Sequence, residues 1–298
     1  MEKVNLFSCV QNPLYISNVK QTAPSANEVS FKSAGGVTDT VSLRTQKERY
    51  LDELNKLFPD GGFDGLCNRI NKDFGIDKPA QVKLVSDDDG VVAGGFNFNR
   101  NEITLSLSDL LGSDTKIVGI KDGKRTVLTS PSVKLPLFID KKNAENFLTL
   151  HSQHGNLGFD KLVAEPVTED DKRKFIAQKV AHEIIHSQQH MIMRKTEGIG
   201  EKEVIKAWTH GKPKNMIENY LLNLQTEKMY NNSYWKTQPE TEQSIKQNSP
   251  ASALAKIWLE AVRNYPPVDS PEYTQNPIER DAYIRSAQYV YNKYGAWS

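Results

Sequence analysis

The sequence predicts an α+β fold, with its strands gathered in one stretch of the chain. Between residues 80 and 140, apolar and polar residues alternate with the period of half-buried strands. Residues 45–74 instead carry apolar side chains at steps of three and four, which is the spacing of helices. The helical spacing returns after Pro166 and continues almost to the end of the sequence. Runs of strands and runs of helices that stay separate are typical of α+β proteins.

The elements divide the chain into three parts. Residues 1–40 are polar and are predicted to form an extended, partly ordered leader. Residues 41–195 are predicted to be an N-terminal lobe with the strands and one long helix, and residues 196–298 a helical C-terminal lobe. The expected helices cover residues 45–58, 63–74, 168–194, 201–209, 213–230, 250–264 and 277–293, and the expected strands fall near residues 82–84, 96–98, 103–107, 116–120 and 125–128.

Composition excludes several classes of function. The formal net charge is +1, and no run of Lys and Arg is dense enough to suggest a nucleic-acid or anionic-membrane partner. Cys9 and Cys67 are too few for a disulfide framework, although one disulfide or two thiols both fit. The sequence begins without the apolar stretch of a secretory signal and has no apolar run long enough to span a bilayer. We therefore expect a cytoplasmic protein, or one that is exported without a cleaved signal peptide.

The long helix should begin at Thr168, because Asp171 follows three residues later as in a capping box. No Gly or Pro interrupts the sequence from there to Gly198, so the helix is predicted to run to about Arg194. One face of it is apolar and should be buried in the core, and its residues are Ile176, Ala177, Val180, Ala181, Ile184, Ile185 and Met191.

This helix carries the motif HExxH, formed by His182, Glu183 and His186. Two histidines four residues apart project from the same side of a helix, so both imidazoles can reach one metal ion. Imidazole suits zinc, and a catalytic zinc needs three protein ligands and a position for water. Zinc lowers the pKa of that water, and Glu183 is placed to take its proton as general base before the hydroxide attacks a carbonyl.

The third ligand has to come from elsewhere. His190 follows His186 by four residues, but it lies about 12 Å along the helix from His182 and is expected at the surface or beside a ligand. The best candidate is Glu279, near the start of the last helix. It has an alternative role, because Asn276 as N-cap and Glu279 three residues later also fit a capping box. Asp281 faces away from Glu279 and has Arg285 four residues on, as in an ordinary surface pair.

With these residues the sequence resembles the gluzincin-like zincins, in which HExxH is followed by a helix bearing a glutamate ligand, often as ExxA. Here that second pattern runs from Glu279 to Ala282, about ninety residues after His186. The resemblance implies a zincin-like fold: a small mixed sheet and the active-site helix in an upper lobe, and a helical lower lobe that supplies Glu279. It also implies a zinc-dependent metallopeptidase whose substrate is a peptide or protein.

Two alternatives to that function stay open. One is a zincin-fold binding protein without turnover, against which the intact Glu183 argues, and the other is a zinc amide hydrolase that is not a peptidase. Similar zincins often use a Tyr or His to stabilise the oxyanion. Tyr283 lies one turn from Glu279 on the same face and is our candidate, with simple packing as its alternative.

Two weaker patterns remain. His151 and His154 form HxxH, which fits a second metal or, more simply, a solvated loop. Residues 101–108 fit either a strand edge above the active-site helix, where an extended peptide can pair, or a plain core hairpin.

Overall fold

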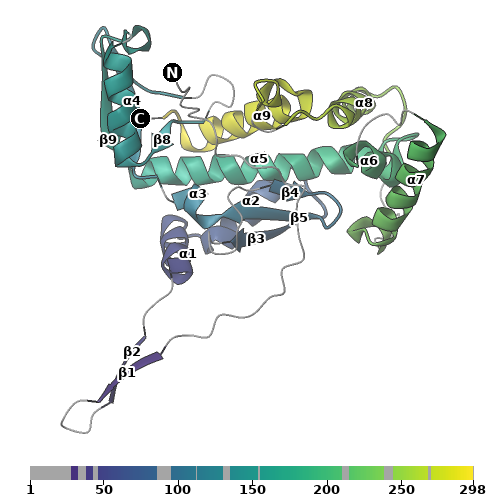
Figure 1. Ribbon diagram of the computed structural model, residues 1–298, viewed down its shortest axis with the longest axis horizontal. Helices are drawn as coiled ribbons and strands as arrows, with labels where there is room; N and C mark the ends of the chain where they lie inside the picture. Colours follow the sequence, from purple (N-terminus) through teal and green to yellow (C-terminus); the bar gives the residue numbers. More distant parts are fainter. Residues whose placement is uncertain are drawn as a thin grey trace.

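The computed structural model is an α+β structure arranged around one long helix, α5 (Glu169–Lys195) (Figure 1). It describes residues 28–32, 38–42, 46–85, 95–111, 113–129, 135–153, 155–209, 215–237, 244–267 and 270–297. Within these residues, no helix has both the length and the apolar character needed to cross a membrane.

The start of α5 is the capping box that the sequence predicts. The Thr168 hydroxyl accepts a hydrogen bond from the backbone N–H of Asp171, and the Asp171 carboxylate accepts one from the N–H of Thr168 at 3.0 Å. The same carboxylate oxygen accepts a hydrogen bond from Lys116 Nζ at 2.8 Å, and both side chains of this pair are buried. Lys116 belongs to β6 (Thr115–Lys121), so the ion pair fastens the first turn of α5 to a strand.

A three-stranded sheet lies on one side of α5, in the order β3-β5-β4. The central strand β5 (Glu102–Ser106) pairs in parallel with β3 (Gln81–Val85) and antiparallel with β4 (Gly95–Asn97). The hairpin between β4 and β5 was expected, and Asn101 turns it with a φ of 49°. Residues 102–104 pair with β3 on one side and β4 on the other, so this part of residues 101–108 is not a strand edge but belongs to the alternative, the core hairpin.

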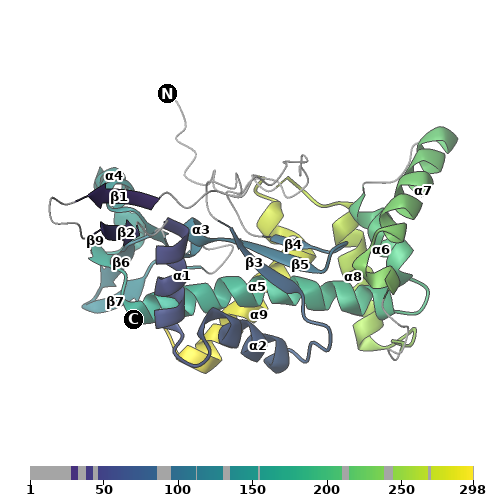
Figure 2. The ribbon, with the colours of Figure 1, turned by 90° about the horizontal axis from the view of Figure 1, so that it is seen from below.

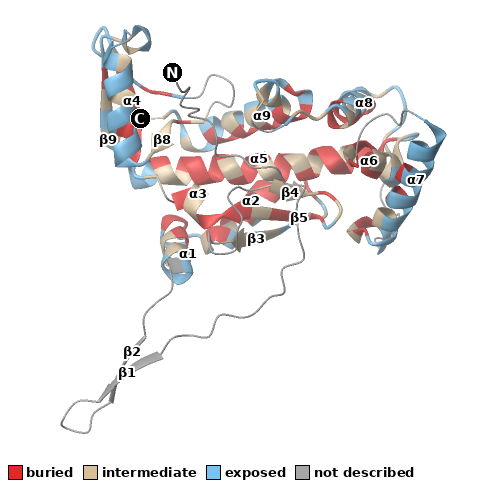
Figure 3. Cartoon of the chain, in the orientation of Figure 1, coloured by how far each residue is buried: buried red, intermediate tan, exposed pale blue. Residues whose placement is uncertain are grey.

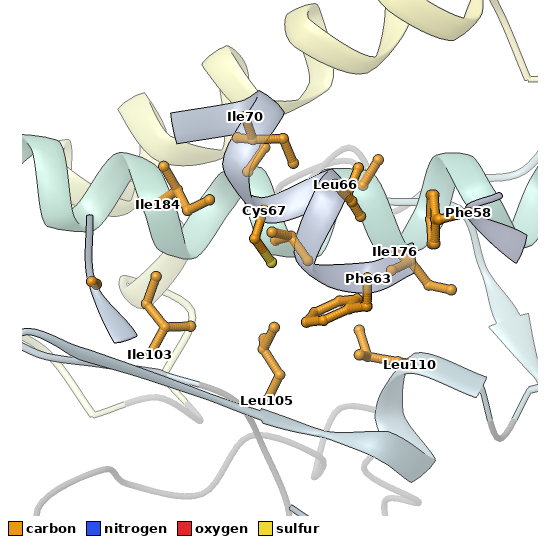
Figure 4. Packing of buried hydrophobic residues seen from close by; sticks show 14 of the residues in the cluster. Phe58, Phe63, Leu66, Cys67, Ile70, Ile103, Leu105, Leu110, Ile176 and Ile184 are labelled. Atoms are coloured by element: carbon orange, nitrogen blue, oxygen red, sulfur yellow. The ribbon is translucent and has the colours of Figure 1, made fainter. Parts of the chain in front are cut away.

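The main core fills the space between α5, this sheet and the first helices, α1 (Gln46–Leu57) and α2 (Gly62–Asp73). Figure 4 shows the side chains of α2 lying between those of α5 and β5. The short helix α3 (Leu107–Leu111) closes the same core. The labelled residues are Phe58, Phe63, Leu66, Cys67, Ile70, Ile103, Leu105, Leu110, Ile176 and Ile184. The apolar face predicted for the long helix is therefore confirmed.

The other side of α5 is covered by α9 (Pro277–Tyr294), which runs antiparallel to it (Figures 1 and 2). Lys174 Nζ, near the start of α5, donates to the carbonyl oxygen of Ala296 at 2.8 Å. At the far end, Gln189 donates to the carbonyl oxygen of Ile278 at 3.0 Å. These contacts lie at opposite ends of the two helices and hold them side by side along most of their length.

The two ends of α5 carry further elements. At its C-terminal end lie α6 (Gly200–Trp208), α7 (Met216–Asn231) and α8 (Pro250–Arg263), with α7 outermost (Figure 2). At its N-terminal end, β6 pairs antiparallel with three other strands. Those strands are β7 (Lys124–Val127), β8 (Phe138–Ile139) and β9 (Lys161–Pro166). The expected Asp122–Gly123 turn joins β6 to β7, and both residues have positive φ, at 50° and 73°.

Most of the predicted elements fall where they were expected, but the short α3 and β8 and three larger features were not predicted. The larger features are α4 (Lys141–Gln153), β9 and the antiparallel hairpin of β1 (Glu28–Lys32) and β2 (Thr38–Ser42). The rest of the predicted leader lies outside the described residues. Figure 3 shows the burial that results: α5 is mainly buried along its length, and α4 and α7 expose most of their surface.

Candidate metal centre

His182 and His186 lie in the middle of α5, one turn apart, on the face that meets α9. Their ring centroids are 4.6 Å apart and their planes are nearly perpendicular, at 88°. Ile184 and Ile185, between them in the sequence, are fully buried. Rotation of α5 about its axis would expose this apolar surface, so packing of the core also determines the direction of the two imidazoles.

Glu279 enters from the first turn of α9. Asn276 is the N-cap, its side chain accepting a hydrogen bond from the N–H of Ile278 at 3.1 Å, and Pro277 occupies the first turn. The predicted cap is thus present, but the Glu279 carboxylate is directed at the histidines of α5. The fully buried Ala282, one turn further on, leaves room for α9 to lie close to α5.

The three side chains bring their ligating atoms into one group. His182 Nε2 and His186 Nε2 are 3.0 Å apart, and each lies 3.3 Å from an oxygen of Glu279. Metal–ligand bonds of about 2.0–2.1 Å at tetrahedral angles place ligand atoms about 3.3 Å from one another. All the ligating atoms of the group lie within 4.8 Å of one another. His182, His186 and Glu279 are therefore spaced as the ligands of one zinc ion would be.

The burial of these atoms also fits a cation. Glu279 is 2% exposed, and its Oε2 atom accepts no hydrogen bond from any described residue. A buried carboxylate oxygen without a hydrogen bond is costly unless a positive charge compensates it. The donor set of two imidazoles and one carboxylate is among those that hold catalytic zinc.

The charges of the group act strongly on one another. Burial by itself would lower the pKa of His186, but the Glu279 carboxylate outweighs this effect and raises that pKa to about 9. Burial by itself would raise the pKa of Glu279, but His186 and His182 lower it well below its ordinary value of 4.5. Glu279 is therefore ionised at neutral pH, and without a metal its charge is balanced by a protonated histidine.

Tyr265 supports Glu279 and was missed by the sequence analysis. It follows α8, and its hydroxyl donates a hydrogen bond to Glu279 Oε1. Tyr265 lies 3.3 Å from the hydroxyl of Tyr273. Burial, together with the charge of Glu279, raises the pKa of Tyr265 well above 10, so its hydroxyl keeps the proton that it donates. No pattern in the sequence distinguishes this Tyr, because its contact depends on how α8 and α9 pack.

Glu183 and Tyr283, the two predicted catalytic residues, both lie at this group. Glu183 is half-buried on α5, and among the described residues no hydrogen bond or ion pair engages its carboxylate. Its charge contributes to raising the pKa of Tyr283, after burial and the charge of Glu279. The Tyr283 ring lies against that of His182, with centroids 4.2 Å apart and the planes inclined at 37°. The pKa of Tyr283 is well above 10, so it presents a protonated hydroxyl.

Asp281, the alternative third ligand, is outside the group of ligating atoms. Its predicted ion pair with Arg285 is present at 3.3 Å. The same carboxylate oxygen also accepts a hydrogen bond from Gln189 Nε2 at 2.8 Å, so Asp281 is more than a surface residue. Gln189 in turn contacts His186 and was not anticipated either.

His190 is also outside the group, but its expected place at the surface or beside a ligand is wrong. It is 1% exposed and lies 3.3 Å from Glu201 on α6. The rings of Phe98 and Trp235 lie 5.8 and 5.6 Å from its own. A local helical pattern does not reveal this burial, because β4, α6 and the 3-10 turn at Tyr234–Thr237 create it.

The other histidine and cysteine patterns add no second centre among the described residues. His151 lies on α4, where its ring contacts Phe147 at 4.3 Å, so the expectation of a loop is wrong there. His154 and Cys9 lie outside the described residues. Cys67 is a buried thiol, and burial raises its pKa to about 12.

Comparison with known proteins identifies no relative, so the functional argument rests on the geometry of the group. No protein-family model, no curated protein and no solved structure matches the chain.

Proposed function

We propose that the protein is a zinc-dependent hydrolase with a zincin-like active site. The single observation that carries the proposal is the convergence of His182 and His186 with Glu279, a residue 93 positions away in the sequence from His186, at the separations of a tetrahedral zinc site. Packing alone gives no reason to aim three polar side chains at one buried point. A zinc ion in such a site lowers the pKa of a water molecule and polarises a carbonyl group.

The remaining chemistry belongs to this chain's own side chains. Glu183 follows His182 directly, and its carboxylate has no hydrogen bond or ion pair among the described residues. It accepts the proton of the attacking water and delivers it to the leaving group. Tyr283 keeps its hydroxyl proton at neutral pH and donates a hydrogen bond to the oxygen on which negative charge develops.

Peptide bonds are the proposed substrate class. HExxH with a glutamate from a later helix is the ligand pattern of zinc peptidases, and the gluzincin-like resemblance rests on His182, Glu183, His186 and Glu279. The Glu183 carboxylate has no hydrogen bond or ion pair among the described residues, which favours a catalytic zinc over a structural one, because a structural site has no use for a general base.

The test compares the wild-type chain with Glu183→Gln, in zinc content and in cleavage of unfolded protein and mixed peptides. We expect about one zinc per chain in both proteins. Hydrolysis should fall by at least roughly a hundredfold in the variant, because glutamine cannot accept the proton. Loss of zinc in Glu183→Gln would contradict the role of base. Cleavage of non-peptide amides alone would point to an amide hydrolase.

A further inference from the structure

Gln189 lies three residues after His186 on α5 and is completely buried between α5 and α9. Its side-chain amide makes three contacts. Oε1 is 2.8 Å from His186 Nδ1, whereas Nε2 donates to the Ile278 carbonyl oxygen at 3.0 Å and to Asp281 Oδ2 at 2.8 Å. One amide group therefore joins a histidine of α5 to the residues on both sides of Glu279.

The orientation of this amide follows from its neighbours. A backbone carbonyl only accepts hydrogen bonds, and so does a carboxylate that is paired with Arg285, as Asp281 is. Only the NH₂ group of Gln189 can therefore face α9, and both of its N–H bonds are used there. The amide oxygen is left facing His186, and a flipped amide would place acceptors against acceptors.

That orientation also determines which nitrogen of His186 carries the proton. An amide oxygen can only accept, so Nδ1 must be the donor in the 2.8 Å contact. When His186 is neutral, its lone pair is then on Nε2. Nε2 is the atom that lies 3.0 Å from His182 Nε2 and 3.3 Å from Glu279.

We propose that Gln189 is a positioning residue that holds His186 in the Nδ1-protonated tautomer, with Nε2 presented to the metal. This inference rests on the proposed zinc site. Outer partners of this kind commonly contribute 10- to 100-fold to metal affinity. Because Gln189 also holds Ile278 and Asp281, it keeps the Glu279 carboxylate at its spacing from α5. His182 has no such support, since its Nδ1 has no hydrogen-bond partner among the described residues.

The experiment measures zinc affinity of the full chain against a chromophoric chelator, for wild type and Gln189→Met. Methionine keeps much of the volume and removes every hydrogen bond. We expect zinc affinity to fall about 10- to 100-fold. The matched control is Gln188→Met. Gln188 also joins α5 to its neighbours, by donating to the Phe74 carbonyl oxygen at 2.6 Å and accepting from Arg285, but it touches neither histidine. The zinc affinity of Gln188→Met should differ from that of the wild type by less than about threefold.

A second readout separates positioning from general structural support. In zinc-loaded, ¹⁵N-labelled wild type, NMR should show His186 with a proton on Nδ1 that exchanges slowly with water. Gln189→Met should make that exchange fast without affecting the signal of His182. A loss of packing alone would not select one ring nitrogen of one histidine. Zinc bound to Nδ1 of His186 in wild type would overturn the inference.

If Gln189→Met does not fold, two other variants test the inference: Gln189→Glu, and Gln189→Glu combined with Asp281→Asn. Gln189→Glu still offers an oxygen to His186 but turns a second oxygen towards Asp281, so zinc affinity should fall. Adding Asp281→Asn removes one of the two acceptors that face that oxygen, the other being the Ile278 carbonyl, and should restore part of the affinity. No recovery would overturn the inference. If the wild-type protein binds no zinc, both the proposed function and this inference are overturned. If it binds zinc with the same affinity as Gln189→Met, only this inference is overturned.

Discussion

The Nε2 atoms of His182 and His186 face each other at 3.0 Å across one turn of α5. Two imidazole nitrogens meet at this distance only through a shared proton or a shared cation, because two lone pairs repel each other. The Glu279 carboxylate, 3.3 Å from both atoms, supplies the negative charge that favours either occupant.

Replacement of both histidines tests the metal directly. In His182→Ala/His186→Ala, zinc content should fall from about one per chain to background, because one carboxylate does not hold a catalytic zinc. Metal analysis of purified protein measures the change. His151→Ala/His190→Ala is the control, and it should keep its zinc because neither residue belongs to the ligand group. Equal zinc in the two double variants would remove the basis of the proposed site.

The role of Glu279 is tested by Glu279→Gln, which preserves size but removes the charge. Zinc affinity should fall by at least about a hundredfold, the upper end of the effect of a supporting residue. Asp281→Asn is the control. Its side chain keeps an oxygen that can accept a hydrogen bond from Gln189, and its zinc affinity should fall by less than about tenfold. If Asp281→Asn loses zinc and Glu279→Gln does not, the ligand is Asp281 and the assignment of Glu279 is wrong.

Tyr283→Phe separates turnover from metal binding. Zinc content should stay the same, and kcat should fall by roughly a hundredfold or more, because an oxyanion hydrogen-bond donor acts in the transition state. Steady-state kinetics on a cleaved peptide checks this. Tyr291→Phe removes a hydroxyl from the same helix at a side chain that is 61% exposed, and kcat should not change. Equal kcat values in both variants would leave Tyr283 with a packing role only.

Asp171 provides a prediction of pH dependence. Burial would raise the pKa of Asp171, but hydrogen bonds from Lys116 and Thr168 outweigh it and lower the pKa below 3.8. A lowered pKa stabilises the fold above pH 3.8, and this contribution is lost as pH falls through the folded value. Asp171→Asn should therefore lower the free energy of unfolding by about 3 kcal/mol at pH 7, because it removes the buried negative charge that pairs with Lys116.

Urea denaturation at pH 7 and at pH 3 measures this effect, and the difference from wild type should shrink at pH 3. Asp170→Asn is the matched control. Its carboxylate is 53% exposed and pairs with Lys174, so less than about 1 kcal/mol should be lost. A difference from wild type that stays constant between the two pH values would contradict the lowered pKa of Asp171.

The helices could be predicted from the sequence where local signals mark their starts. The Thr168–Asp171 box and the Asn276–Pro277 start are such signals, and α5 and α9 begin where these place them. α4 was missed because only Ala144 of its residues is buried, so it has little apolar periodicity. β9 was missed because it is defined by its pairing with β6, which is distant in sequence.

The same distinction holds at the candidate site. His182, Glu183 and His186 form a local pattern, and Glu279 could be found because its helix start and the ExxA pattern coincide. Tyr265 and Gln189 depend on the packing of α8 and α9 against α5, and their spacing in the sequence gives no indication of it. The burial of His190 has the same kind of origin, since aromatic rings from separate parts of the chain surround it.

The antiparallel contact of α5 and α9 has a consequence for the order of synthesis. The two histidines are made almost a hundred residues before Glu279, so the growing chain holds an incomplete group until α9 has emerged from the ribosome. α9 must then dock along α5, with Gln189 at one end and Lys174 at the other, before three ligands exist. A nascent or truncated chain without α9 therefore lacks the carboxylate of the group, and under the proposed function it would not hydrolyse a substrate.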